Sequence, residues 1–478
     1  MRPSNSVTLF LCSTLAASAP AVAQQVVPIR ELSAPEAKTS QHFGSILGVR
    51  HLAGGGLLVN DAGRRQLVTL DPSFANRAVL VDSVAEGGQS YGPRAAPLIP
   101  FLGDSSLFVD GQSLSLLVID PSGKIMTVRS APKPGDLGAL AGGSSGVDSK
   151  GNLLYRAPIR RTMGAPAGGP GAGGIPTPPP PSDSATIVRA SFDTRNVDSI
   201  ARVKIANGQS INVVPSGDGK MVMTTTINPL TTVDDWTVLS DGTIALVRGH
   251  DYHVDWIKPD GSTFSSPKMP FDWKRLTDED KQALIDSART AQEKMQADMK
   301  AAAANPGAAG AAGRAGAEVA AVGGMQVTMV MAGPGGGGGG ASIGGGGGGD
   351  RVFSGGGTPG NMSFSGPNGA MSMTQKLEFV PIKAIADYYP AIRPGAAKAD
   401  LDGNLWVLPT TSAQAKAGEL VYDVINNKGE LFQRVRLPLG RSIAGFGHKG
   451  VVYLMYRDGT NGWLLERTKI LNSARAAE

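Results

Sequence analysis

Histidine and aspartate are the residue types in this sequence best suited to acid–base or metal chemistry. The chain has 478 residues, with five histidines and one cysteine, Cys12. A disulfide scaffold, a cysteine zinc site and thiol catalysis are therefore excluded. His250 and His253 are close in sequence, but their odd separation would point them to opposite faces of one strand. A turn or surface role is favoured over chelation for this pair.

Three aspartates are candidate metal ligands. Asp148, Asp235 and Asp400 each stand beside a glycine turn or at the start of a short β-rich run. Carboxylate oxygens that converge on one point suit calcium or another divalent cation. An aspartate beside a turn also accepts hydrogen bonds from backbone amides, so both roles remain open for each of the three.

A second set of side chains could contact an organic ligand. Aromatic residues near a concave mouth serve as anchors, with packing in the core as the alternative. The candidates are Arg50, His51, Asp235, Trp236, Tyr388, Tyr389 and His448. These residues come from four distant places in the sequence, so they can act together only if the fold brings those places together.

The elements that must position these side chains form a repeat. Short β-rich runs separated by glycine turns recur six times, for example in residues 57–70, 107–123 and 403–429. Equivalent turns recur about every 40 to 50 residues, a spacing typical of the blades of a propeller. A sheet of four strands cannot cover both of its faces alone, and radial stacking buries them against neighbouring sheets. A pair of β-sandwich domains is the alternative.

This unit resembles the six-bladed β-propeller proteins of the TolB-like and NHL-like group, and most of all an exported bacterial family of largely unassigned activity. Segments 43–49, 236–261 and 403–407 carry the resemblance, which covers residues 40–272 and 388–471. It implies an all-β fold with six blades around a funnel. In lactonase and lyase propellers of this fold, convergent acids hold a calcium or other divalent ion. Alignment of the repeats predicts the innermost strands at 48–52, 98–102, 146–148, 234–238, 396–400 and 443–448.

Two inserts interrupt the predicted propeller, which spans residues 24–272 and 388–471. Glycine makes up 65 of the 478 residues, well above its usual share of roughly 7%, and much of the excess lies in a Pro/Gly-rich loop at 164–181 and a Gly-rich insert at 304–387. Few bulky apolar groups offset the ordering entropy of the longer insert, which predicts disorder. Between these inserts, apolar residues at spacings of three and four predict an amphipathic helix within 273–303. The helix would pack on the propeller or dock on a partner.

The N-terminal pattern indicates a targeting segment. Arg2 precedes an apolar stretch at 7–17 and the small-residue site Ala21-Val22-Ala23, a pattern typical of a secretory signal peptide over residues 1–23. The sequence therefore predicts an exported protein, periplasmic or extracellular. Beyond this segment no run of about 18 apolar residues predicts a transmembrane helix. The net charge of +5 comes without a Lys/Arg-dense stripe, so no nucleic-acid partner is expected.

These observations favour an exported binding module over an enzyme. The module would recognise a ligand or protein partner of unknown identity through its funnel face. The alternative is a metal-dependent, calcium-type hydrolase or lyase of the lactonase-like propeller class, with a divalent cation such as calcium as its cofactor. An assembly role for the helix and the Gly-rich insert is a third possibility. Residues 472–478 form a tail, and the sequence leaves the oligomeric state open.

Overall fold

The computed structural model describes residues 27–83, 90–92, 96–110, 113–140, 144–159, 182–206, 209–215, 220–304, 321–322, 325–326, 354–356, 361–366 and 369–471. The expected signal peptide, the Pro/Gly-rich loop 164–181 and the tail 472–478 lie outside these residues. So does most of the Gly-rich insert. Everything below concerns the described residues.

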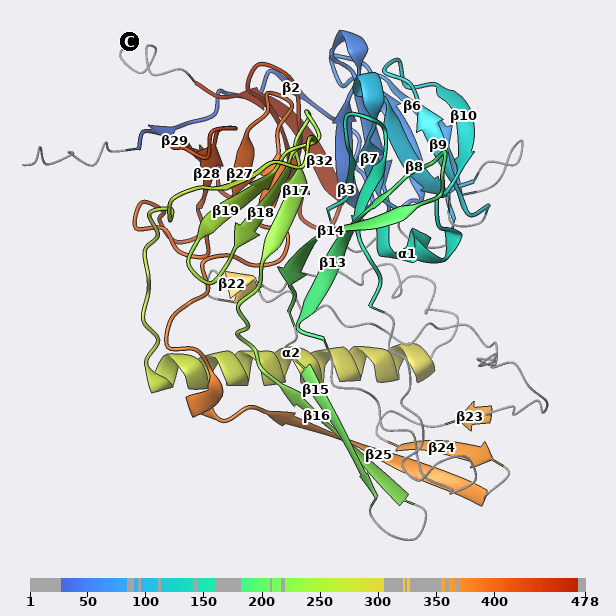
Figure 1. The fold of residues 1–478 in the computed structure, drawn as a ribbon, viewed down its shortest axis with the longest axis vertical. Helices are drawn as coiled ribbons and strands as arrows, with labels where there is room; N and C mark the ends of the chain where they lie inside the picture. Colours follow the sequence, from blue (N-terminus) through green and yellow to red (C-terminus); the bar gives the residue numbers. More distant parts are fainter. Residues whose placement is uncertain are drawn as a thin grey trace, which may run out of the picture.

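Six sheets form the blades of a propeller (Figure 1), which confirms the predicted fold class. The chain adds strands to each blade in order from the axis outward. Blade 1 contains β3 (Ile46–His51), β4 (Leu57–Asp61), β5 (Gln66–Leu70) and β6 (Arg77–Val81). Blade 2 contains β7 (Leu98–Pro100), β8 (Ser106–Asp110), β9 (Ser115–Ile119) and β10 (Ile125–Ser130). Blade 3 contains β11 (Gly146–Val147), β12 (Leu153–Arg156), β13 (Ser184–Ala190) and β14 (Val197–Lys204).

The other three blades follow the same antiparallel order. Blade 4 contains β17 (Asp235–Val238), β18 (Ile244–Arg248), β19 (His253–Ile257) and β20 (Thr263–Ser265). Blade 5 contains β26 (Ala397–Ala399), β27 (Leu405–Val407), β28 (Leu420–Ile425) and β29 (Leu431–Leu437). Blade 6 contains β30 (Ser442–Phe446), β31 (Val451–Arg457) and β32 (Trp463–Lys469).

The N-terminal segment closes the ring. β2 (Ala37–Lys38) pairs antiparallel with β32 and supplies the outer strand of blade 6. β1 (Ile29–Arg30) pairs in parallel with β29 of blade 5. β2 therefore closes the ring, while Leu32 contributes an isolated bridge to Ile470.

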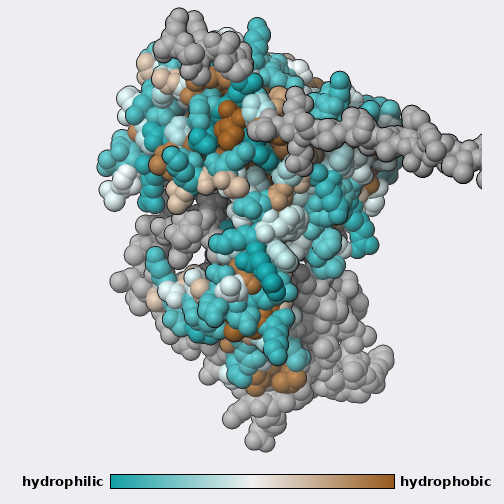
Figure 2. All heavy atoms as spheres, turned by 90° about the vertical axis from the view of Figure 1, so that its left-hand side faces the viewer, coloured by the Kyte–Doolittle hydropathy of each residue, from teal (hydrophilic) through white to brown (hydrophobic). Residues whose placement is uncertain are grey.

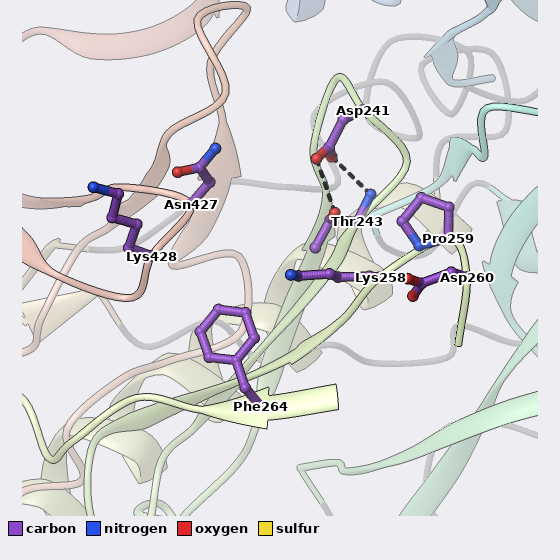
Figure 3. Close-up of a pocket in the computed structure, with 8 residues that line it drawn as sticks. All are labelled: Asp241, Thr243, Lys258, Pro259, Asp260, Phe264, Asn427 and Lys428. Carbon is purple, nitrogen blue, oxygen red and sulfur yellow. Dashed lines mark hydrogen bonds between the residues drawn. The ribbon is translucent and has the colours of Figure 1, made fainter. Parts of the chain in front are cut away.

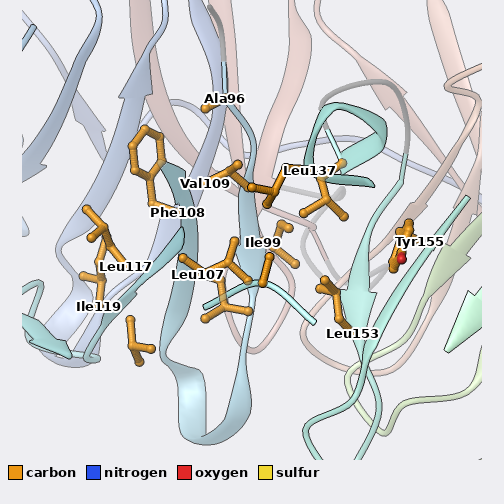
Figure 4. Packing of buried hydrophobic residues seen from close by; sticks show 14 of the residues in the cluster. Ala96, Ile99, Leu107, Phe108, Val109, Leu117, Ile119, Leu137, Leu153 and Tyr155 are labelled. Carbon is orange, nitrogen blue, oxygen red and sulfur yellow. The ribbon is translucent and has the colours of Figure 1, made fainter. Parts of the chain in front are cut away.

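The hydrophobic core lies between the blades. The middle strands are the most apolar, and all five residues of β8 and of β9 are buried. Figure 4 shows the largest cluster of the described residues, in which Ile99 and Leu107 of blade 2 lie between Phe108 of the same blade and Leu153 of blade 3. The outermost strands, such as β10, are mostly exposed. In Figure 2, hydrophilic residues accordingly cover most of the described surface in view, with scattered hydrophobic patches. Radial packing of the sheets thus stabilises the fold.

An inserted module lies below the propeller in Figure 1. Its sheet has the order β15 (Gln209–Pro215), β16 (Lys220–Ile227), β25 (Gly369–Phe379), β24 (Asn361–Gly366) and β23 (Ser354–Gly356). The hairpin β15–β16, which the sequence analysis included in the propeller, belongs to this sheet. β24 and β25 are strands within the range expected to be disordered. β21 (Ala321–Val322) and β22 (Met325–Gln326) pair separately.

The predicted amphipathic helix is α2 (Asp278–Ala304), and it belongs to the inserted module. Thr277 Oγ1 accepts a hydrogen bond from the Asp280 amide, and three acids in the first turn favour the helix dipole. Leu284 and Ile285 of α2 are buried with Ile385 and Tyr389 in a small core. The described residues contain one further α-helix, α1 (Leu137–Leu140). Among the described residues, no helix has both the length and the apolar character needed to cross a membrane.

Candidate functional site

The first strands of the six blades surround the propeller axis and define its two ends. At one end each first strand turns into the second, and we call this the turn end. At the other end the chain enters each blade, and the inserted module joins there, after β14 and after β20. Neighbouring turns meet at the turn end. Gly242 of blade 4, with φ of +86°, lies so close to blade 3 that a Cβ would be 2.8 Å from the Ser149 nitrogen.

Four ionisable side chains from three blades lie at the turn end, and Arg50 reaches toward blade 2 while its neighbour His51 reaches toward blade 6. Arg50 and His51 end β3 of blade 1, Asp104 lies in the β7–β8 turn of blade 2, and His448 follows β30 of blade 6. The rings of His51 and His448 stand edge to face with centroids 5.6 Å apart. His448 Nε2 lies 3.9 Å from Asp104 Oδ2, and their side chains are 46% and 62% exposed. We name these four residues the axial cluster. Solvent reaches it, so a ligand can reach it too.

A buried tyrosine fixes one of the imidazoles. The Tyr453 hydroxyl and His51 Nδ1 share a hydrogen bond of 2.7 Å. Tyr453 is fully buried, and burial raises its pKa to about 12, so the phenol keeps its proton at neutral pH. Burial also lowers the pKa of His51, His448 lowers it further, and Asp104 partly opposes both effects. His51 is therefore held in one orientation and is mainly neutral at pH 7.

Arg50 supplies the permanent positive charge of the axial cluster. Its Nε donates to Ser106 Oγ at 3.3 Å. The side chain is half-buried, and the surrounding protein lowers the pKa of Arg50 to about 10. It stays charged at neutral pH. Within the part of the chain that the structure describes, no carboxylate lies within ion-pair distance of the guanidinium, although Asp104 acts on it at longer range.

Two of the three proposed metal ligands are used by their own turns. Asp148 accepts hydrogen bonds from the Lys150 and Asn152 amides and from Asn152 Nδ2, and Arg189 Nε lies 3.0 Å away. Asp400 makes the same bonds to its turn and also accepts from Trp406 Nε1 at 2.9 Å. Both carboxylates therefore face N–H donors, which is the turn role that the sequence left open.

Asp235 lies at the opposite end of the axis. It begins β17, and its Oδ2 accepts from the Ala397 amide of blade 5 at 2.8 Å. Burial raises the pKa of Asp235 to about 6, against the opposing effect of that amide. The three aspartates thus do not form one ligand set. In the described residues, no three His, Cys, Asp or Glu side chains gather in a way that would hold a metal ion.

The aromatic candidates lie elsewhere. Trp236 is 3% exposed and packs in the core between blades 3 and 4. Tyr389 is buried in the small core of the inserted module. Tyr388 is 46% exposed, and it forms a backbone bridge with Arg275 where the chain returns to the propeller. Of the predicted contact residues, the structure brings together Arg50, His51 and His448.

Sequence reasoning missed three partners of these residues. Asp104 lies in the turn before β8, Ser106 is the first residue of β8, and Tyr453 lies in β31. His51 and Tyr453 are 402 positions apart, so no local pattern could have connected them. For Asp104, the available signal was the repeat itself, because its turn is equivalent to the one that carries His448.

A groove of about 500 Å³ lies between blades 4 and 5 (Figure 3). Three turns form it, and Asp241 accepts from the Thr243 amide and hydroxyl. The charged groups of this groove are solvent-exposed, with equal numbers of positive and negative side chains. They therefore indicate no preferred charge for a ligand. The lining residues are Asp241, Thr243, Lys258, Pro259, Asp260, Phe264, Asn427 and Lys428.

Comparisons with known proteins give likenesses of fold. No family model and no curated protein matches the chain. A catalytically inactive virginiamycin B lyase from Staphylococcus aureus, solved with quinupristin, is 10% identical over 92% of this chain and 99% of that chain, with a TM-score of 0.34. A DUF4221 family member from Bacteroides vulgatus is 9% identical over 94% and 98%, with a TM-score of 0.34. The calcium-binding protein regucalcin from Agrobacterium tumefaciens is 12% identical over 50% and 79%, with a TM-score of 0.22. At these sequence identities and TM-scores, the likenesses carry no information about activity.

Proposed function

We propose that this protein is an exported binding module that recognises a small-molecule ligand at the turn end of its propeller axis. The observation that carries the proposal is the axial cluster, because ionisable side chains from blades 1, 2 and 6 meet there at a solvent-accessible point. Polar groups that converge from separate elements are typical of ligand sites.

The chemistry of the site supports binding over metal-dependent hydrolysis. The carboxylates that could hold calcium accept N–H donors instead, and Asp148 and Asp400 lie at the other end of the axis from Asp235. These residues do not fit a calcium ion, so no catalytic step is derived through one. His51, held by Tyr453 and flanked by Arg50, can accept a hydrogen bond from a ligand or donate one to it.

Export is the second part of the proposal, and the N-terminal pattern at residues 1–23 supports it. Expression of the full chain in a bacterial host, followed by N-terminal sequencing of the periplasmic fraction, tests it. The mature chain is expected to begin at Gln24. Recovery of the uncleaved chain in the cytoplasm would refute export without affecting the binding site.

Histidine NMR tests the binding function directly. We suggest labelling the five histidines with ¹⁵N and adding a bacterial extract of small molecules, filtered to remove macromolecules. The ring signals of His51 and His448 are expected to move. His253 is an internal control, because it is held between Asp251 and Asp255 at the outer part of blade 4. Movement of all five signals together, or of none, would count against binding at the axial cluster.

A further inference from the structure

We infer that the ligand of the axial cluster carries an anionic group, a carboxylate or a phosphate, that binds Arg50 beside the imidazoles of His51 and His448. This inference rests on the proposed function and names the chemical class of the ligand.

The first argument is the hydrogen-bonding capacity of Arg50. A guanidinium offers five N–H donors in a planar fork that matches carboxylate and phosphate oxygens. Nε is used by Ser106. Among the described residues, neither terminal nitrogen has a hydrogen bond or ion pair with another side chain. A half-buried arginine whose outer donors lack protein acceptors suits a ligand that brings two acceptor oxygens.

The second argument is the balance of charge. Within the axial cluster, Arg50 carries a permanent positive charge, the two imidazoles add positive charge only when protonated, and Asp104 is the one acid. That carboxylate is mostly exposed and lies 3.9 Å from His448, so solvent screens its attraction for the other groups. Arg50 supplies a full positive charge in addition to this screened carboxylate, and protonation of either imidazole would add to it. The guanidinium itself repels a cationic ligand.

The third argument is preorganisation. The hydrogen bond between the Tyr453 hydroxyl and His51 Nδ1 fixes the His51 ring, and the edge-to-face contact places His448 beside it. Little side-chain entropy is then lost when a ligand binds. Within the described residues, His51 Nε2 has no hydrogen-bond partner, so it can donate to an anion once it carries a proton.

Anion binding should also be linked to proton uptake. The groups that act on His51 are His448, Asp104, Arg50 and Arg467, and Arg467 is paired with Glu36 at 3.3 Å. An added negative charge beside the ring favours its protonated form and raises its pKa. Affinity for an anion is therefore expected to increase as the pH falls from 8 to 6.

Titration with inorganic phosphate and with acetate tests the inference. Ionic strength is held constant with sodium chloride, and glucose and choline serve as neutral and cationic probes. We expect saturable movement of the His51 and His448 signals with at least one anion, and none with glucose or choline. The arm that saturates at lower concentration identifies phosphate or carboxylate as the preferred group. Acetate stays ionised throughout this range, and its affinity at pH 6 is expected to exceed its affinity at pH 8.

Variants separate a specific site from general charge attraction. Arg50→Gln should weaken anion binding by roughly tenfold or more, since a bidentate charged contact is lost. Arg50→Lys keeps the charge but loses the planar fork of donors, so its anion affinity should lie between those of the wild type and Arg50→Gln. Arg129→Gln on the outer strand of blade 2 is the matched control and should bind like the wild type. An unshifted His253 signal shows that each variant is folded.

The results also separate this inference from the proposed function. Equal affinity of the wild type and Arg50→Gln would overturn the inference. The inference would also be overturned if the His51 and His448 signals responded to the cell extract or to glucose but to neither anion. That result would leave the proposed binding function in place. No response to any probe or to the extract would overturn both.

Discussion

Asp235 is the side chain whose burial has the clearest consequence for stability. It lies at the contact between blades 4 and 5, where its carboxylate accepts the Ala397 amide and has Lys398 nearby. Burial raises its pKa from 3.8 to about 6. The folded state therefore binds a proton that the unfolded chain releases between about pH 4 and pH 6. Through this group, stability is greatest at low pH and decreases as the pH rises through that range.

Asp235→Asn should remove this dependence. An asparagine can still accept the Ala397 amide and has no proton to lose. We expect the free energy of unfolding of the variant, relative to the wild type, to rise by up to about 3 kcal/mol between pH 4 and pH 7. Urea unfolding at several pH values measures this. A constant difference between the two proteins over this range would show that Asp235 titrates normally.

At the scale of elements, buried tyrosines join neighbouring blades. Tyr91 donates to Asn60 of blade 1, Tyr252 of blade 4 donates to Asp423 of blade 5, and Tyr453 of blade 6 bonds to His51 of blade 1. Asp423 is 1% exposed, and Arg434 Nε also donates to it at 2.7 Å. The blades are therefore held together by polar contacts of fixed geometry as well as by apolar packing.

Tyr252→Phe tests the contribution of one such contact. The change removes a donor at 2.6 Å from a buried carboxylate and should cost about 1.5–3 kcal/mol of unfolding free energy. Tyr422→Phe is the matched control, because Tyr422 is buried beside Asp423 and no hydrogen bond of its hydroxyl is found among the described residues. Denaturant unfolding compares the two variants. Equal losses would mean that ring packing, and not the hydrogen bond to Asp423, accounts for the effect.

The sequence predicted the innermost strands well and their neighbours less well. Innermost strands were predicted at residues 98–102 and 234–238, and β7 and β17 occupy Leu98–Pro100 and Asp235–Val238. Glycine turns at a regular spacing predict where strands begin and end, because a turn depends only on the residues next to it. The meeting of His51 with Tyr453, and the parallel pairing of β16 with β25, depend on contacts between distant segments. No local spacing encodes such contacts, so Tyr453 was missed.

At the scale of the whole molecule, the propeller and the inserted module meet at a few backbone positions. The Asp234 amide donates to the Lys204 carbonyl, which brings together the two ends of the first insertion. Arg275 and Tyr388 form a bridge, and the Leu276 amide donates to the Asp387 carbonyl, at the base of the second insertion. Each insertion thus leaves and rejoins the propeller at neighbouring points.

Replacing residues 207–227 and 277–386 each with a short Gly-Ser turn should leave a folded propeller. We expect the double deletion to unfold cooperatively within about 5 °C of the wild type and to bind anions equally well. Deleting 277–386 alone removes β25 and leaves the edge of β16 unpaired, which should promote aggregation. Calorimetry and size-exclusion chromatography measure both effects. A double deletion that fails to fold would show that the module stabilises the propeller.

The closing strand also affects the order in which the protein can fold. Thr39 beside β2 and Leu465 in β32 exchange hydrogen bonds across 426 positions, so the ring cannot close until β32 has been synthesised. Until then, the first and last blades both present open edges, and contacts this distant in sequence form slowly. An exported chain would cross the membrane unfolded, so its open edges would form on the far side. There a strand of another chain could pair with them. The interval between the appearance of β2 and that of β32 is therefore the period in which newly made chains are most exposed to aggregation.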